Sequence, residues 1–584
     1  MSIRVVLATI VAFCFGLILT SCSRPIAPPT AKPEPEGKVS LFDNTVGGIA
    51  ELEGWASIPV KGYGIVMGLA GTGSRECPRQ ILEIIQAGTR GRTRPDGKPI
   101  FGDANLRELI NSPNTAVVVL QGEIPPAAAA GDKIDLTVST LPNTQTTSLA
   151  GGDLFVSELS IEAPTTSGTP VRTRPMALAG YPEPAPIFVN PFASDNPESR
   201  PVSLRSGKII GGGQVLKSRP LRLVLRVPGG SARLVRQITE RINFRFPVPP
   251  GEPATAEALD RMTVNLMIPR EYQSQTRHFL MLVLQTSIFD DPVWIANWSE
   301  QLIAELAKPN SPAEQITAAL ESIGNSTVPA LRQAYQSSEP RVRFYSARTA
   351  ALLGDDQAVP VVSQFAAEDS SPYQLPATTA LGELPKRDQS NRALRPLLDS
   401  ENTLVRIRAY EFLAKNADSS VVPVSFTRPA EFGLDVVYSN GQPLIYVQTM
   451  KQSRIALFGE SLRCEGSVFY LSGDKLVTIT SAQADGQLSV LRCTPTSGAI
   501  GLKLQTSPDL ISLIKTLGTD VEPDFQGIHH GLGLDYSQTV AALYGLWQSK
   551  AIRAGFVLQQ PEIAREVVEQ ATAPVTQRLE TSTR

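Results

Sequence analysis

The order of apolar and polar residues divides the chain into a β-rich part, a helical part and a second β-rich part. Between residues 42 and 290, short runs either alternate between apolar and polar positions or are continuously apolar, as expected for strands of half-buried or buried sheets. The expected strands are 115–120, 134–139, 154–161 and 220–227, and the expected amphipathic helices are 79–87 and 232–244. This part is predicted to be a β-rich α/β body.

Residues 291–420 follow a helical period. Ala, Leu and Glu become more frequent, and similar segments return after roughly 31 residues. Val328–Leu331 resembles Val359–Val362, and Val342-Arg343 returns two units later as Val405-Arg406. The pattern is similar to HEAT-type repeats, in which paired helices stack so that each buries the apolar face of the next. A plain helical bundle is the alternative.

Alternation returns in residues 421–560. Gly441, Gly473-Asp474 and Asp485-Gly486 separate six short runs and are expected to form hairpin turns. The expected strands are 434–438, 444–449, 455–458, 467–471, 476–481 and 487–492, followed by helices at 508–518 and 536–555 and a strand at 556–558. With 584 residues, the whole chain is predicted to be an α+β multidomain protein.

Residues 1–21 have the features of a secretory signal peptide. Arg4 is followed by an apolar run, Val5–Leu19, that is too short to span a bilayer comfortably. The segment Leu19-Thr20-Ser21-Cys22 resembles the bacterial lipobox, which implies a thioether-linked lipid on Cys22 and cleavage before it. An ordinary secretory signal with an incidental cysteine is the alternative.

Residues 22–41 link the expected lipid to the folded chain. The proline-rich run RPIAPPTAKPEPEG favours an extended, polyproline-like tether. Ser23 follows the cysteine, at a position where aspartate favours inner-membrane retention in many bacteria. The expected location is therefore the periplasm, with the lipid in the outer membrane. Residues 561–584 are expected to form a polar tail.

The amino-acid composition limits the partners and the reactions that can be expected of the chain. A formal net charge of −2 and an aromatic content of 6% give no reason to expect a nucleic-acid partner. An oxidising periplasm permits a disulfide between Cys464 and Cys493, which leaves Cys77 as a buried thiol rather than a nucleophile. His529-His530 lie in an expected loop without a third ligand at metal-binding spacing. With no catalytic motif, the chain is predicted to have no cofactor, no metal and no enzymatic activity.

Two stretches near the front carry the most specific motifs. Residues 61–73 read KGYGIVMGLAGTG, and residues 116–152 read AVVVLQGEIPPAAAAGDKIDLTVSTLPNTQTTSLAGG. The glycine spacing in the first stretch is not the dinucleotide-binding fingerprint, and no P-loop lysine-serine pair follows it. It instead predicts a strand that ends at a glycine-rich turn before a helix.

In order and spacing, these motifs resemble the flagellar P-ring protein family, which forms a ring around the rod in the bacterial periplasm. The matching residues are Gly62, Tyr63, Gly64, Gly68, Gly71, Thr72, Gly73, Pro125, Pro126, Gly131, Asp135, Gly151 and Gly152. The resemblance implies that they determine the fold and contribute ring contacts. The chain departs from the family at Ser74, where aspartate is usual, and in the long loop 88–103, whose basic residues could touch an anionic partner such as peptidoglycan or form a solvated loop.

The resemblance implies a structural subunit of the flagellar basal body that supports motility. Copies would associate through head-to-tail interfaces into a homo-oligomeric ring, with rod and outer-membrane-ring proteins and peptidoglycan as neighbours. Residues 421–560 would then be the second half of a P-ring-like body, although the family's Asn-x-Arg-Thr-Gly segment is not recognisable there. The alternatives are an envelope lipoprotein that uses the same fold and the repeats as a protein-binding scaffold, which the lipobox and the repeats favour, and an enzyme of the cell wall.

Overall fold

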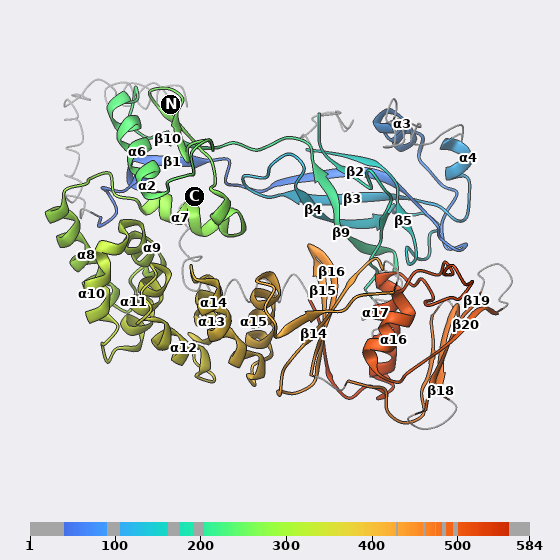
Figure 1. Ribbon diagram of the computed structural model, residues 1–584. Helices are drawn as coiled ribbons and strands as arrows, with labels where there is room; N and C mark the ends of the chain where they lie inside the picture. The colour runs from blue at the N-terminus through green and yellow to red at the C-terminus, as the bar shows by residue number, and fades with distance from the viewer. Residues whose placement is uncertain are drawn as a thin grey trace, which may run out of the picture. The chain divides into compact units, whose positions relative to one another are not determined.

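The computed structural model describes residues 40–89, 106–161, 174–190, 204–427, 430–459, 462–473, 475–481, 486–493 and 500–559. The expected signal peptide, the lipid site Cys22, most of the tether, loop residues 90–103 and the tail lie outside these residues. The chain divides into two units, Met1–Asp43 and Asn44–Arg584. In the described part of the first unit, the Asp43 carboxylate accepts a 2.8 Å hydrogen bond from the backbone N–H of Ser40. The second unit is α+β, as predicted (Figure 1).

Six antiparallel strands close into a β-barrel. The sheet order runs β3-β4-β9-β7-β6-β2, and β2 also pairs with β3, so that the barrel has no open edge between them. Strands β5 and β8 extend the sheet beside β2. The strands are β2 (Ile58–Met67), β3 (Ala116–Ile124), β4 (Lys133–Thr140), β5 (Asp153–Leu154), β6 (Ser157–Ser160), β7 (Pro175–Ala179), β8 (Ala185–Pro186) and β9 (Ser206–Val215).

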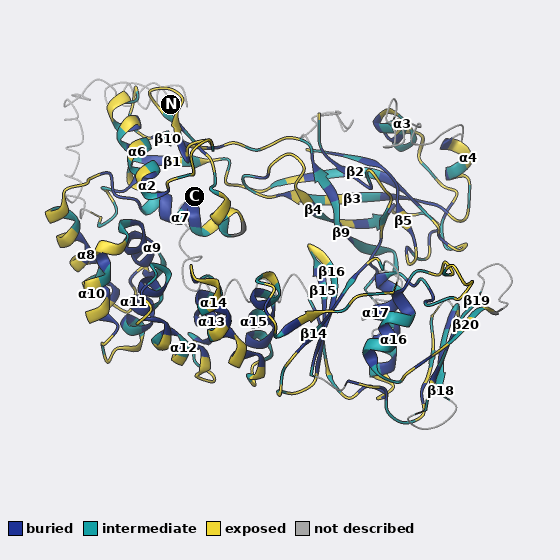
Figure 2. Cartoon of the chain, viewed as in Figure 1, coloured by how far each residue is buried: buried dark blue, intermediate teal, exposed yellow. Residues whose placement is uncertain are grey.

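Side chains fill the barrel because successive strand residues face opposite sides. In β3, Val118, Leu120 and Ile124 are fully buried in one apolar cluster with residues of the other strands. Val117 faces the other way and packs with α3 (Arg79–Thr89) and α4 (Leu106–Ile110), which cover part of the outer wall (Figure 2). The single strand expected at 154–161 is wrong, since it splits into β5 and β6 at Phe155-Val156.

A second sheet and its helices complete the first β-rich part. The order is β1-β10-β12-β11, with every pairing antiparallel, and its apolar face packs on α6 and α7. The elements are α2 (Val46–Ile49), β1 (Ala50–Glu53), β10 (Leu221–Leu225), α6 (Ala232–Arg245), β11 (Ala256–Ala258), β12 (Thr263–Leu266), the 3₁₀ helix η2 (Arg270–Gln275) and α7 (Thr276–Gln285). Ser231 caps α6 by accepting the Leu234 N–H at 3.3 Å.

Stacked helical pairs follow, as the repeats predict. Helices α9, α11, α13 and α15 contact one another in succession, and α8, α10, α12 and α14 each pack on the helix that follows (Figure 1). The helices are α8 (Pro292–Leu306), α9 (Ala313–Ile323), α10 (Val328–Ala334), α11 (Pro340–Leu352), α12 (Val359–Ala367), α13 (Gln374–Gly382), α14 (Arg387–Leu394) and α15 (Thr403–Lys415), with the 3₁₀ helices η3 (Asn325–Thr327) and η4 (Arg395–Asp399). Among the described residues, no helix combines the length and apolar character needed to cross a bilayer.

The C-terminal part contains a five-stranded sheet of order β13-β14-β16-β15-β21. Its elements are β13 (Val421–Pro423), β14 (Gly433–Val437), β15 (Leu444–Met450), β16 (Gln452–Phe458), α16 (Leu510–Gly518), α17 (Tyr536–Gln548) and β21 (Gly555–Leu558). The hairpin expected at Gly441 is wrong, because β16 lies between β14 and β15 and pairs with both. The hairpin turn is instead at Lys451, whose φ is 63°. The helix expected to reach Gly555 ends at Gln548, because Lys550 (φ 61°) leaves the helical conformation.

A separate four-stranded antiparallel sheet has the order β17-β18-β19-β20. Its strands are β17 (Phe469–Leu471), β18 (Val477–Ser481), β19 (Leu488–Cys493) and β20 (Ile500–Thr506). The pairing of β17 with β18 and of β18 with β19 confirms the two hairpins expected there. Cys464 and Cys493 are free thiols, which contradicts the predicted disulfide. The backbone of Cys464 forms an isolated β-bridge with Ile552, near α17. The backbone of Cys493 instead pairs with Ile500 at the end of the four-stranded sheet.

We predict that Gly62→Ala destabilises the chain. A Cβ at Gly62 would overlap the Glu158 carbonyl oxygen of β6, and backbone cannot move aside as a flexible side chain can. Overpacking of this kind costs about 1–3 kcal/mol. Urea unfolding of the full chain measures the loss as a lower midpoint. The control is Gly473→Ala, where a Cβ would meet nothing within 4 Å. Equal midpoints for the two variants would show that the approach of β6 to β2 is not the reason for glycine.

Candidate functional site

The two motif stretches meet at the end of β2. Thr72 Oγ1 donates to the Ser148 carbonyl at 2.9 Å, and the Thr147 N–H donates to the Thr72 carbonyl at 2.8 Å. Gly152 packs so closely against Val66 and Leu69 that a side chain would not fit. The segments that carried the family resemblance therefore form one interlocked turn structure.

The remaining motif residues occupy the barrel and its turns. Gly62, Tyr63 and Gly64 lie in β2, and Pro125-Pro126 follow the end of β3. Gly131 (φ +99°) precedes β4, where Asp135 lies. Gly68 and Gly71 both have φ near +84° in the turn after β2, a conformation that favours glycine.

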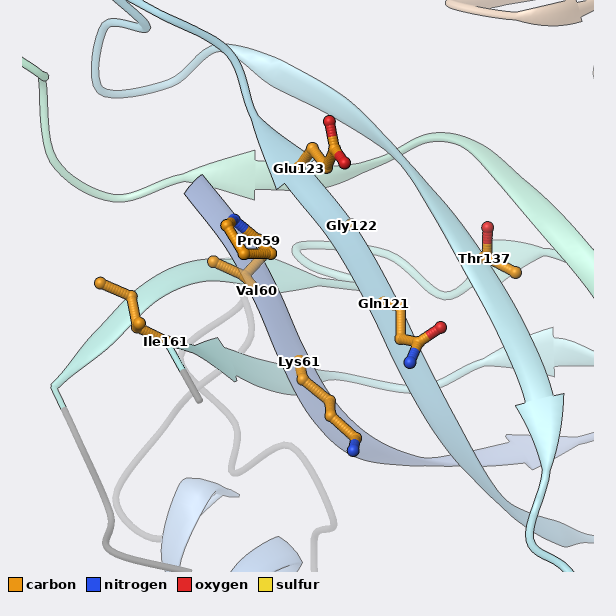
Figure 3. Close-up of a pocket in the computed structure, with 8 residues that line it drawn as sticks. All are labelled: Pro59, Val60, Lys61, Gln121, Gly122, Glu123, Thr137 and Ile161. Atoms are coloured by element: carbon orange, nitrogen blue, oxygen red, sulfur yellow. The ribbon is translucent and has the colours of Figure 1, made fainter. Parts of the chain in front are cut away.

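A hollow of about 560 Å³ lies on the outer wall of the barrel (Figure 3). It crosses three strands, because Lys61 of β2 pairs with Gln121 of β3, which pairs with Thr137 of β4. Gly122 contributes only backbone to it, since a Cβ there would point toward Leu136 in the barrel core. The lining residues are Pro59, Val60, Lys61, Gln121, Gly122, Glu123, Thr137 and Ile161. Mixed apolar and polar groups of this kind suit a contact surface.

Asp135 joins the barrel to the C-terminal sheet. Its carboxylate accepts the Gly211 N–H at 2.7 Å and the Lys451 N–H at 2.9 and 3.2 Å. Lys451 is the turn residue of the β15–β16 hairpin. The motif aspartate therefore fixes a hairpin tip that follows it by 316 positions, a role that local sequence could not indicate.

A second contact between the barrel and the C-terminal part is made at the start of α17. Ser537 Oγ accepts the Val189 N–H at 3.2 Å and donates to the Val189 carbonyl at 3.1 Å. The rings of Phe188 and Tyr536 lie 5.5 Å apart, and the Tyr536 hydroxyl lies 2.8 Å from the Arg454 carbonyl. The barrel is therefore held to the sheet at two separate points.

Three carboxylates gather beside this second contact. Asp535, the N-cap of α17, accepts the Gln538 N–H at 2.7 Å. Burial raises the pKa of Asp535 to about 6, and the charges of Glu431 and Asp153 add to the shift. Burial also raises the pKa values of Asp153 and Glu431. Like charges in a poorly hydrated place oppose ionisation.

The helical pairs are attached to the body at their first end through α7. His278 Nε2 lies 2.9 Å from Glu321 Oε1 of α9. Arg245 of α6 donates to the backbone carbonyls of Glu321 and Ser322 at 2.9 and 3.0 Å. Burial opposes the charge on His278, but Glu321 outweighs it and the pKa of His278 is raised.

At the other end, α15 is joined to the five-stranded sheet. Tyr410 donates to Asp435 of β14 at 2.8 Å, and Asp435 also forms a 2.6 Å ion pair with Arg454. Tyr446 of β15 donates to Glu411 at 3.1 Å. The helical insert is therefore fixed at both ends.

The candidate chemical residues are not assembled into a reaction centre. His529 Nδ1 lies 2.7 Å from the Val521 carbonyl, and His530 Nε2 lies 2.8 Å from Asp524. Burial raises the pKa of the half-buried Cys77, which lowers its nucleophilicity at neutral pH. Within the described ranges, no group of three His, Cys, Asp or Glu side chains is placed to hold a metal.

The fold defines a class of protein in which a closed β-barrel body carries a fixed α-solenoid. The barrel body and the helical pairs match two different known families. Residues 45–293 match the family described as flagellar P-ring protein, and residues 299–382 match HEAT repeats. Both resemblances expected from the sequence are confirmed for these residues.

Individual relatives match the same part. The flagellar P-ring protein of Caulobacter vibrioides is 32% identical over 224 residues, covering 36% of this chain and 52% of the relative. That of Anaeromyxobacter dehalogenans strain 2CP-C is 30% identical over 243 residues, covering 40% and 57%. Flagellar P-ring protein 1 of Hahella chejuensis is 36% identical over 111 residues, covering 19% and 27%. The matched part of the chain spans about half the length of the first relatives.

We predict that Asp535→Asn stabilises the chain at neutral pH. The folded-state pKa of about 6 exceeds the usual value of 3.8, so Asp535 costs stability as pH rises from about 4 to 6 and this cost remains at pH 7. Asparagine keeps the cap but carries no charge. The difference between the two pKa values corresponds to an expected gain of about 3 kcal/mol at pH 7 and only about 0.5 kcal/mol at pH 4, measured by urea unfolding.

The control for the capping change is Asp509→Asn at the N-cap of α16. A gain for Asp535→Asn that was the same at pH 4 and pH 7 would contradict the electrostatic explanation.

Proposed function

We propose that the chain is a structural subunit of the bacterial flagellar basal body, which forms a P-ring-like ring around the distal rod and supports motility. The observation that carries the proposal is the match of residues 45–293 to the flagellar P-ring family, in which both motif stretches interlock at the end of β2. A structural role agrees with the absence of an assembled reaction centre in the described part of the chain. The protein is accordingly proposed not to be an enzyme.

The proposed ring is a homo-oligomer with head-to-tail interfaces. The motif turns and the hollow on the barrel wall are the proposed ring contacts, since the hollow joins three strands beside the glycine-rich segment of β2 (Figure 3). Rod and outer-membrane-ring proteins, together with peptidoglycan, are the proposed neighbours.

The proposed division of the chain follows the change of period in the sequence. A signal peptide (1–21) and a tether (22–41) precede the P-ring-like domain (42–290). The helical repeats (291–420) separate it from the C-terminal part (421–560), and a tail (561–584) follows. Attachment of the β15–β16 hairpin to the barrel through Lys451 and Asp135 supports the interpretation of residues 421–560 as the second half of one body.

The second candidate function is a lipid-anchored scaffold of the cell envelope that binds another protein through the repeats. The observation that favours it is the helical insert, which is fixed at both ends and which the matches to P-ring relatives do not include. The two candidates differ in whether the chain assembles with itself.

Electron microscopy of the purified mature protein tests the choice. Closed rings, together with loss of swimming after deletion of the gene, are expected for the basal-body subunit, because head-to-tail contacts close when the rotation per subunit permits. Monomers at every concentration, combined with normal swimming of the deletion strain, would sink this proposal and favour the scaffold.

We predict separately that Cys22→Ala releases the protein from the membrane fraction. Burial of lipid chains holds a lipoprotein in the bilayer at about 0.8 kcal/mol per methylene, and the variant has no attachment site. Fractionation of cell envelopes followed by detection of the chain measures the change. Ser23→Ala is the matched control and is expected to stay in the membrane. Unchanged fractionation of Cys22→Ala would refute lipidation at this residue.

A further inference from the structure

A second hollow, of about 250 Å³, opens at the start of α15, where the last helical pair meets the five-stranded sheet. Thr403 and Arg406 of α15 lie on one side of it. Leu444 of β15 and the segment Arg553–Gly555 before and at the start of β21 lie on the other. No carboxylate is among its lining residues. This hollow belongs to neither the barrel nor the segment that matches the P-ring family.

Arg406 places an incompletely neutralised cation in this hollow. Its side chain is buried, with a residue exposure of 3%. Nε donates to the Leu398 carbonyl at 2.9 Å and Nη2 to Ser439 Oγ at 3.2 Å, but within the described chain no carboxylate forms an ion pair with it. Asp399 acts on it through space, while its carboxylate accepts the Asn440 N–H at 2.7 Å. A buried charge without a close counter-ion is costly and favours an incoming anion.

Two further features add positive potential. The hollow lies at the N-terminus of α15, a helix of 13 residues whose dipole favours negative charge there. Arg553 stands at the same hollow with its side chain 79% exposed, and its partner Glu465, at 3.1 Å, is 42% exposed. Such a solvent-exposed pair is weak and can exchange partners. A buried guanidinium, a helix N-terminus and a second guanidinium therefore favour a carboxylate ligand.

The chain carries a matching acidic projection between α16 and α17. Asp520, Glu522 and Asp524 occur within five residues, and no Lys or Arg lies between Lys515 and Lys550. Next to them, Phe525 is fully exposed, with a relative exposure of 107%.

The projection is ordered by Asp524. Its carboxylate accepts the N–H groups of Gln526 and Ile528 at 2.8 and 3.0 Å and lies 2.8 Å from His530 Nε2. These hydrogen bonds lower the pKa of Asp524 to about 2. An exposed aromatic on a pre-ordered loop loses little conformational entropy when it binds, as anchor residues do.

We propose that the hollow at the start of α15 binds a carboxylate of the Asp520–Phe525 loop from a second copy of this chain. Glu522, which is exposed on the same loop as Phe525, supplies the carboxylate to the two arginines, and Phe525 covers the apolar rim at the exposed Pro443. The two surfaces are different, so the contact is head-to-tail. The inference rests on the proposed assembly of the chain and names one interface for it.

Sedimentation velocity of the full chain over a range of concentrations tests the contact. Phe525→Ala and Arg553→Glu are each expected to weaken self-association by about tenfold or more. Combining Arg553→Glu with Glu522→Arg restores opposite charges across the interface and is expected to recover most of the loss. Phe469→Ala and Arg270→Glu are the matched controls, because Phe469 is 68% exposed and the Arg270 side chain is 80% exposed in an ion pair elsewhere.

The outcomes separate this inference from the proposed function. If the unmodified chain assembles and Phe525→Ala and Arg553→Glu assemble equally well, the interface is overturned and the ring proposal stands. Equal losses in the control variants, or no recovery in the charge-exchanged double variant, also overturn it. If the unmodified chain remains monomeric at every concentration, the interface is overturned, and the proposed function fails with it only if the deletion strain also swims normally.

Discussion

The closure of the barrel at β2 is the constraint on which the rest of the structure depends. This strand pairs with β3 along one edge and with β5 and β6 along the other. Both sets of neighbours approach where Gly62 and Gly64 have no side chains. Closure of the barrel fixes the position of β4, which carries Asp135. It also fixes the turn at Thr147-Ser148, which forms hydrogen bonds with Thr72. The barrel therefore supplies a rigid frame for contacts made by segments that come much later in the chain.

Continuity between the body and the helical pairs comes from a shared helix. Helix α7 buries Phe279, Leu280 and Val283 against the second sheet and also contacts α9. Ala318 of α9 belongs to the same apolar cluster. The interface between α7 and α9 is therefore part of the apolar core and is reinforced by the His278–Glu321 contact. As a result, the helical pairs pack directly on the body and are not joined to it by a linker alone. At the other end of the insert, Tyr410 and Tyr446 join α15 to the five-stranded sheet through hydrogen bonds of their buried hydroxyl groups.

Much of the fold could be predicted from local pattern. Alternation placed β4, β10 and β18 nearly to the residue, since the side-chain period of a strand is visible in a few positions. The hairpin placed at Gly441 was wrong because strand order depends on long-range pairing, and only the inserted β16 shows that β14 and β15 are not neighbours. The disulfide was wrong because flanking a strand-rich segment says nothing about where Cys464 and Cys493 point. The burial of Arg406 could not be predicted from local pattern, because it depends on η4, β16 and the 439–441 turn together.

The clasp between Asp135 and Lys451 has a consequence for how the chain is built. The strands of the barrel end at Val215, yet the residue that caps Asp135 follows it by 316 positions. During synthesis from the N-terminus, the barrel wall that receives this hairpin emerges well before the hairpin that covers it. Until the helical pairs and β15–β16 are complete, that wall remains open to other chains, a stage at which partly folded multidomain proteins are prone to misassembly. Long-range closure thus delays completion of the body until nearly the whole chain is present.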